Sequence, residues 1–188
     1  MGNRYKYFKL RKPKLKEEGF YTIGFVKDIK NGKIVLMAEA VMGQLARTHC
    51  TCGLSQNEGE FDNEPGYTFG IAQVDMKVYL DTMVNDRDYL EVMLMHELGH
   101  YLANHHNLLT EEYSKIRKKS EKVMPEELIC DEFAIRECGI DRFLKFIDKL
   151  IAVRMTYYKE DEIIKRKAIN EMMQRKEHAI EYASSLVH

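Results

Sequence analysis

Two histidines four residues apart, with a glutamate directly after the first, constrain the fold of this chain more than any other feature. The segment reads His96-Glu97-Leu98-Gly99-His100. Four residues advance an α-helix by about 400°, so on a helix His96 and His100 lie one above the other on a single face. Glu97 then lies about 100° around the axis, beside the histidines. We therefore predict a helix here, beginning after the polar residues at 85–88.

The residues around this motif predict an amphipathic helix. Five apolar or aromatic residues share the side away from His96: Leu90, Leu94, Leu98, Tyr101 and Leu102. They predict a face anchored in the core, whereas Met93 lies with the histidines and Glu97 on a face towards a cleft. Gly99 lowers helix propensity by about 1 kcal/mol relative to Ala. We therefore expect another element to approach Gly99 closely.

This pattern of residues suits metal-assisted hydrolysis. Two imidazoles on one helix face can bind a single Zn²⁺, with Zn–N distances of about 2.0–2.1 Å. The metal lowers the pKa of a bound water towards about 7, and the carboxylate of Glu97 can take its proton as a general base. Catalytic zinc usually has three protein ligands, so we expect one more ligand elsewhere in the chain.

We predict that Glu127 is the third ligand. It lies in a segment whose Pro125 suits the first turn of a helix and whose Gly139 suits its end. Asp131 follows one turn after Glu127, where its carboxylate can accept a hydrogen bond from a metal-binding histidine and fix its tautomer. Small residues on the same side would let this helix pack close to the first: Cys130, Ala134 and Cys138.

The two motifs together resemble those of the ImmA/IrrE family of gluzincin-type metallopeptidases. The family pattern is HExxH followed by Glu-x-x-Ala-Asp-x-Phe-Ala. The chain has Glu-x-x-Cys-Asp-x-Phe-Ala at 127–134, with Cys130 at the small alanine position. The resemblance covers about residues 70–140, and neither end of the chain has a motif that matches.

The resemblance implies a zinc site with the ligands His96, His100 and Glu127. It also implies that Glu97 is the catalytic acid and base, and that Asp131 supports a ligand from behind. A peptide or protein substrate is expected, for example a repressor protein inside a bacterial cell. The chain has no clear helix-turn-helix of its own, so such a target would be a separate protein.

Other metal ligands remain open. His106 lies ten residues after His96, where metzincins place a third histidine, although Ala103 stands where those enzymes have a glycine. Cys50 and Cys52, with the preceding histidine, could bind a second, structural zinc, or Cys50 could bind the catalytic metal as an inhibitory thiolate. The donor to the reaction's oxyanion is equally open. Its candidates are Tyr101, Tyr157, Tyr158, Arg154 and His178.

Strands early in the chain and helices late predict an α+β domain with a helical C-terminal region. The resemblance implies that this domain is zincin-like, with a short antiparallel or mixed sheet and an active-site helix. The strands are expected at 20–30, 67–72 and 74–81, the last two as separate strands or as one bent strand, and a loop is expected at 48–66. The segment from Ile34 to Leu45 fits either the second strand of a hairpin or a helix, and we favour the helix. Further helices are expected at 110–122, 125–138, 141–159 and 161–185.

The expected organisation has three parts. Residues 1–18 hold seven basic side chains before the first acid and are expected to form a flexible, solvated arm. Residues 19–140 form the metallopeptidase domain, and residues 141–188 form a helical extension packed on it. The charges of 159–181 are expected to form the solvated face of a helix.

Composition limits the partners. The chain has 29 basic and 30 acidic residues and a net charge of −1, so we expect no dedicated nucleic-acid binding.

No apolar run approaches the roughly 18 residues that a membrane-spanning helix needs, and no apolar stretch follows the N-terminal charges as in a secretory signal. We therefore expect a cytoplasmic protein with reduced cysteines. The oligomeric state is left undetermined.

Three functions follow from these features. The first is peptide-bond hydrolysis by metal-activated water, with an extended substrate paired to the strand at 74–80. The second is a non-catalytic regulatory or protein-interaction module that keeps the fold and the metal. Glu97 favours the enzyme, because zinc binding alone does not need it. The third is nucleic-acid binding through the basic arm.

Overall fold

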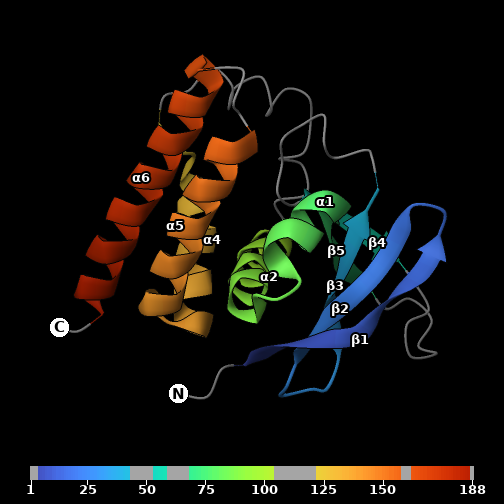
Figure 1. Ribbon diagram of the computed structural model, residues 1–188. Helices are drawn as coiled ribbons and strands as arrows, with labels where there is room; N and C mark the ends of the chain where they lie inside the picture. The colour runs from blue at the N-terminus through green and yellow to red at the C-terminus, as the bar shows by residue number, and fades with distance from the viewer. Residues whose placement is uncertain (1–3, 43–52, 59–67, 104–121, 158–161, 187–188) are drawn as a thin grey trace.

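The computed structural model confirms an α+β fold with a mixed sheet, a motif-bearing helix and a helical C-terminal region (Figure 1). Helix α2 (Arg87–Leu102) lies between the sheet and the remaining long helices. The residues that the structure describes are 4–42, 53–58, 68–103, 122–157 and 162–186. The expected helix at 110–122 falls almost wholly outside these residues, as do parts of the loop predicted at 48–66.

Within the described residues, the sheet has five strands in the order β1-β2-β3-β5-β4. Strands β1 to β3 form an antiparallel meander, β5 runs parallel to β3, and β4 runs antiparallel to β5. Their bounds are β1 Tyr5–Glu17, β2 Phe20–Asp28, β3 Ile34–Val41, β4 Gly53–Glu58 and β5 Thr68–Asp75. The strand expected at 20–30 is confirmed, whereas β4 contradicts the loop expected there.

The helix favoured from Ile34 onwards is wrong over residues 34–41, which form β3. Gly32 has a φ of 73° and closes the turn between β2 and β3, as the Asn31-Gly32 pair allows. β3 is a central strand, and all but one of its residues are buried. A strand buried on both faces lacks the alternation of apolar and polar residues, so its sequence also fits helical spacing.

The flexible arm expected at residues 1–18 is also wrong where the structure describes it. β1 pairs with β2 along its length, and Tyr5 and Tyr7 are buried in the core. The basic residues between and after these tyrosines are mostly exposed. β1 ends one side of the sheet, and lysines on such edge strands discourage further strand pairing. The charges that indicate a solvated tail are therefore those of an edge strand.

The strand expected at 74–81 ends at Asp75. The carboxylate of Asp75 accepts hydrogen bonds from the backbone N–H groups of Lys77 and Val78, at 2.9 and 3.2 Å, and caps a helical turn. Residues 76–83 form α1 (Met76–Val78) and the π-helical η2 (Tyr79–Met83). The predicted pairing of a substrate with a strand at 74–80 therefore lacks its strand beyond Asp75.

The long helices agree closely with the sequence. Beyond α2 they are α4 (Pro125–Cys138), α5 (Ile140–Tyr157) and α6 (Glu162–Ser185). α2 contributes Leu90, Leu94 and Leu98 to the main core. Its predicted faces are partly wrong, because Met93 is buried and Leu102 is 47% exposed. Among the described helices, none has the length and apolar character needed to cross a bilayer.

Candidate metal centre

Helix α2 carries both motif histidines to the face that meets α4. The helix begins after Asp86, whose carboxylate accepts a hydrogen bond from the N–H of Tyr89 at 2.9 Å. His96 is 5% exposed and His100 is partly buried. The two rings lie edge to face, with their centroids 4.8 Å apart. The predicted arrangement of two imidazoles on one helix face is therefore present.

Helix α4 brings the predicted carboxylates to this face. Pro125 occupies its first turn, and Gly139, at a φ of 88°, follows its last residue. A Cβ added at Gly99 of α2 would lie 3.2 Å from both Cα and Cβ of Cys130. The close approach that Gly99 predicts is thus made by α4, and the small Cys130 permits it. Because the helix axes approach so closely, short side chains from both helices can meet.

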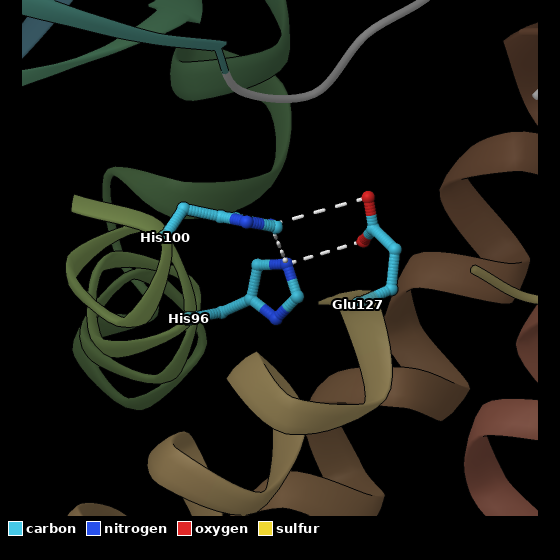
Figure 2. Close-up of side chains that lie close together, drawn as sticks. All are labelled: His96, His100 and Glu127. Carbon is cyan, nitrogen blue, oxygen red and sulfur yellow. Dashed lines mark hydrogen bonds and ion pairs between the residues drawn. The ribbon is translucent and has the colours of Figure 1, made fainter. Parts of the chain in front are cut away.

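The three predicted ligands come together between these helices (Figure 2). Nε2 of His96 lies 3.1 Å from Nε2 of His100 and 3.3 Å from Oε2 of Glu127. Nε2 of His100 lies 3.9 Å from Oε1 of Glu127. Glu127 is only 6% exposed. Three donor atoms that converge within 4.8 Å of one another could hold a metal ion.

Asp131 lies behind His96, as the sequence predicts. Its Oδ1 is 2.8 Å from Nδ1 of His96, and the carboxylate is fully buried. Since an ionised carboxylate only accepts hydrogen bonds, Nδ1 of His96 must donate. Nε2 is then the ring nitrogen that remains for a metal ion, and it lies beside His100 and Glu127. Asp131 therefore fixes the tautomer that a metal ligand requires.

Arg175 of α6 is a member of this site that sequence reasoning missed. Its Nε donates to Oδ2 of Asp131 at 2.7 Å, and its Nη2 donates to Oδ1. Arg175 as a whole is 3% exposed, in a segment whose charges were expected to form a solvated helix face. That expectation is wrong for Arg175. One local signal was available, because Arg175 shares a helical face with the buried Ala168, Met172 and Ala179.

The buried charges stabilise one another. Burial alone would raise the pKa of Asp131, but the Arg175 guanidinium and His96 hold the pKa of that carboxyl below its usual range. For His96, burial and Arg175 lower the pKa, and the carboxylates of Asp131 and Glu127 outweigh them. The pKa of His96 without a metal is raised to about 9. A cation at Nε2 would replace this proton and occupy the same field of negative charge.

No family model matches this chain, and neither does any curated protein or solved structure. The assignment of metal ligands therefore depends on the geometry of these residues. The resemblance to the ImmA/IrrE family remains an expectation from the two motifs.

The residues predicted as general base and as oxyanion donors lie in different parts of the structure. Glu97 is partly buried on α2, and burial, Glu127 and Glu97 together raise the pKa of the Cys130 thiol. Tyr101 packs against Gly70 of the sheet. His178 pairs with Glu132 at 2.9 Å.

Arg154 of α5 lies within 3.7 Å of Glu171 of α6, so it binds the helices to each other. The other candidates lie outside what the structure describes: His106, Cys50, Cys52, Tyr158 and the side chain of Tyr157. His106 as a third ligand therefore stays a prediction.

Proposed function

We propose that the chain is a zinc-dependent metallopeptidase whose metal ligands are His96, His100 and Glu127. Two imidazoles and one carboxylate form a donor set of catalytic zinc sites, which keep one position open. A tetrahedral ion with ligands about 2.05 Å away separates neighbouring ligand atoms by about 3.3 Å. The contacts of 3.1 and 3.3 Å from Nε2 of His96 are close to that separation. This convergence of donors carries the proposal.

The residues would divide the work of hydrolysis. When bound, zinc would acidify a water molecule and polarise the scissile carbonyl. Glu97 would take a proton from the attacking water as the water oxygen adds to the carbonyl carbon, and would give that proton to the leaving amine when the C–N bond breaks. Asp131 keeps Nδ1 of His96 protonated throughout, so this ring stays oriented. Zinc binding alone does not need a carboxylate at position 97, which favours hydrolysis over a purely structural metal.

The substrate class in this proposal is a peptide or a protein inside the cell. It rests on the resemblance of the motifs at 96–100 and 127–134 to those of the ImmA/IrrE metallopeptidases. By the same resemblance, cleavage of a regulatory protein such as a repressor is the activity to look for first.

Substitution of Glu97 by Gln separates catalysis from metal binding. We expect Glu97→Gln to keep about one equivalent of zinc while cleavage of a proteome-derived peptide library, read by mass spectrometry, falls by about 10²–10⁴-fold. His100→Ala should lose both zinc and cleavage. Glu91→Gln is a matched control on the same helix, because Glu91 pairs with Arg142 and not with the ligands.

Two results would contradict the proposal. Cleavage that survives in Glu97→Gln would exclude this residue as the base. Zinc-loaded wild type that cleaves no peptide in the library would favour the non-catalytic regulatory module instead.

A further inference from the structure

Arg175 contacts two buried carboxylates of α4 at the candidate metal centre, those of Asp131 and Glu127. It binds Asp131 through two nitrogens, one on each carboxylate oxygen. Its Nη1 also lies 3.6 Å from Oε2 of Glu127, the oxygen that is 3.3 Å from Nε2 of His96. One guanidinium of α6 therefore contacts the third ligand and the residue that orients the first ligand.

This geometry needs an arginine. The planar guanidinium donates two parallel hydrogen bonds to one carboxylate and still has donors to spare, whereas a lysine ammonium is a point charge. Nη2 of Arg175 also lies 3.3 Å from Nδ1 of His96. Since that nitrogen donates to Asp131, the guanidinium packs against the ring edge and limits its rotation. Oδ1 of Asp131 thus receives donors from two helices at once.

Two effects of Arg175 on a metal oppose each other. Its positive charge repels a nearby cation, which by itself weakens binding. Its hydrogen bonds hold Asp131 in place and its charge attracts Glu127, whose Oε2 lies 3.6 Å from Nη1, which strengthens binding, because groups that orient metal ligands typically contribute about 10–100-fold in affinity. Both carboxylates are nearly or fully buried. A buried carboxylate without its partner would turn away or become protonated, and the ligand geometry would be lost.

We propose that Arg175 is a positioning residue of the metal centre, which makes metal binding and the docking of α6 depend on each other. The inference rests on the proposed metal site. α6 is then part of the metal centre, although the three proposed ligands lie on α2 and α4. Metal binding favours the docked helix, and loss of the docked helix loosens the ligands, because linkage between two sites is reciprocal.

A substitution that keeps the charge separates geometry from electrostatics. Zinc affinity is measured by competition with a chromophoric chelator for the wild type, Arg175→Lys and Arg175→Met. We expect both variants to bind zinc about 10–100-fold more weakly. A role limited to charge predicts unchanged affinity for Arg175→Lys and tighter binding for Arg175→Met.

Arg142→Lys is the matched control. Arg142 of α5 also binds two carboxylates, those of Asp88 and Glu91 at 2.9 and 2.7 Å, but these lie near the start of α2. We expect the Arg142→Lys variant to bind zinc with the affinity of the wild type. A loss in Arg142→Lys as large as in Arg175→Lys would mean that any weakened helix contact lowers affinity, and would overturn the inference.

Hydrogen exchange of the wild type tests the coupling without any substitution. We expect zinc to slow exchange of the α6 amides around Arg175 as well as those of α2 and α4. Protection confined to α2 and α4 would overturn the inference, even if Arg175→Lys failed to fold. If the wild type binds zinc but Arg175→Lys binds it equally well, only this inference fails. If the wild type binds no zinc, the proposed function fails with it.

Discussion

At the scale of single residues, the proton on His96 is the main competitor of the proposed metal ion. Without a metal, the carboxylates of Asp131 and Glu127 raise the pKa of this imidazole to about 9 against the opposing effects of burial and Arg175. An ordinary histidine has a pKa of about 6.5. The metal-free fold is therefore stabilised by this proton below pH 6.5 and loses that contribution as the pH rises through about 9.

Zinc affinity should rise with pH, whereas the stabilisation of the metal-free fold by the His96 proton falls. Because the metal must displace the proton of Nε2, the apparent affinity is expected to rise about tenfold per pH unit from about pH 6.5 and to level off near pH 9. Competition titrations against a chelator of known pH dependence measure this directly. In Asp131→Asn the pKa of His96 should fall and the plateau should move to lower pH. An affinity that stays constant over this range would mean that His96 carries no proton to displace.

At the scale of elements, the close packing of α2 on α4 sets the distance between the ligands. Gly99 leaves no room for a side chain, since an added Cβ would already lie 3.2 Å from the backbone Cα of Cys130. We expect Gly99→Val to lower the free energy of unfolding by about 1–3 kcal/mol through overpacking, and to weaken zinc binding because the helices are forced apart.

Denaturant unfolding of the metal-free variant, together with its zinc affinity, checks this prediction. Leu102→Val is the control, because Leu102 is 47% exposed on the same helix and should change neither quantity appreciably. Full stability and full affinity in Gly99→Val would show that the two helices are not packed as described.

Sequence predicted the elements whose signals are local. Helices α2 and α4 carry start signals, end signals and ligand spacing within their own residues, so their bounds and the cluster of His96, His100 and Glu127 could be predicted. β3 was misread because its burial on both faces depends on its neighbours in the sheet. The lysines of β1 resemble those of a flexible tail in the sequence, and only the position of β1 at the edge of the sheet explains them.

Arg175 illustrates why part of the site was not predictable. It lies 44 residues after Asp131, and no spacing rule connects two residues on different helices. Their meeting depends on how α6 packs across α4, which is a property of the tertiary fold. A buried position on α6 could be inferred from its apolar neighbours, but its carboxylate partners could not.

At the scale of the whole molecule, the candidate centre joins three helices that are distant in the chain. α2 supplies two candidate ligands, α4 supplies the third, and α6, which lies on the side of these helices away from the sheet, supplies Arg175 (Figure 1). Residues 141–188, expected as an extension, therefore contribute to the site through α6. A metal that binds only when all three helices are in place stabilises the entire folded chain.

Anomalous diffraction at the zinc absorption edge, from crystals of the full chain grown with zinc, tests the central claim most directly. We predict a single strong peak between α2 and α4, within about 2.0–2.2 Å of Nε2 of His96, Nε2 of His100 and one oxygen of Glu127. A peak completed by His106 with Glu127 turned away, or no peak at these histidines, would contradict the account.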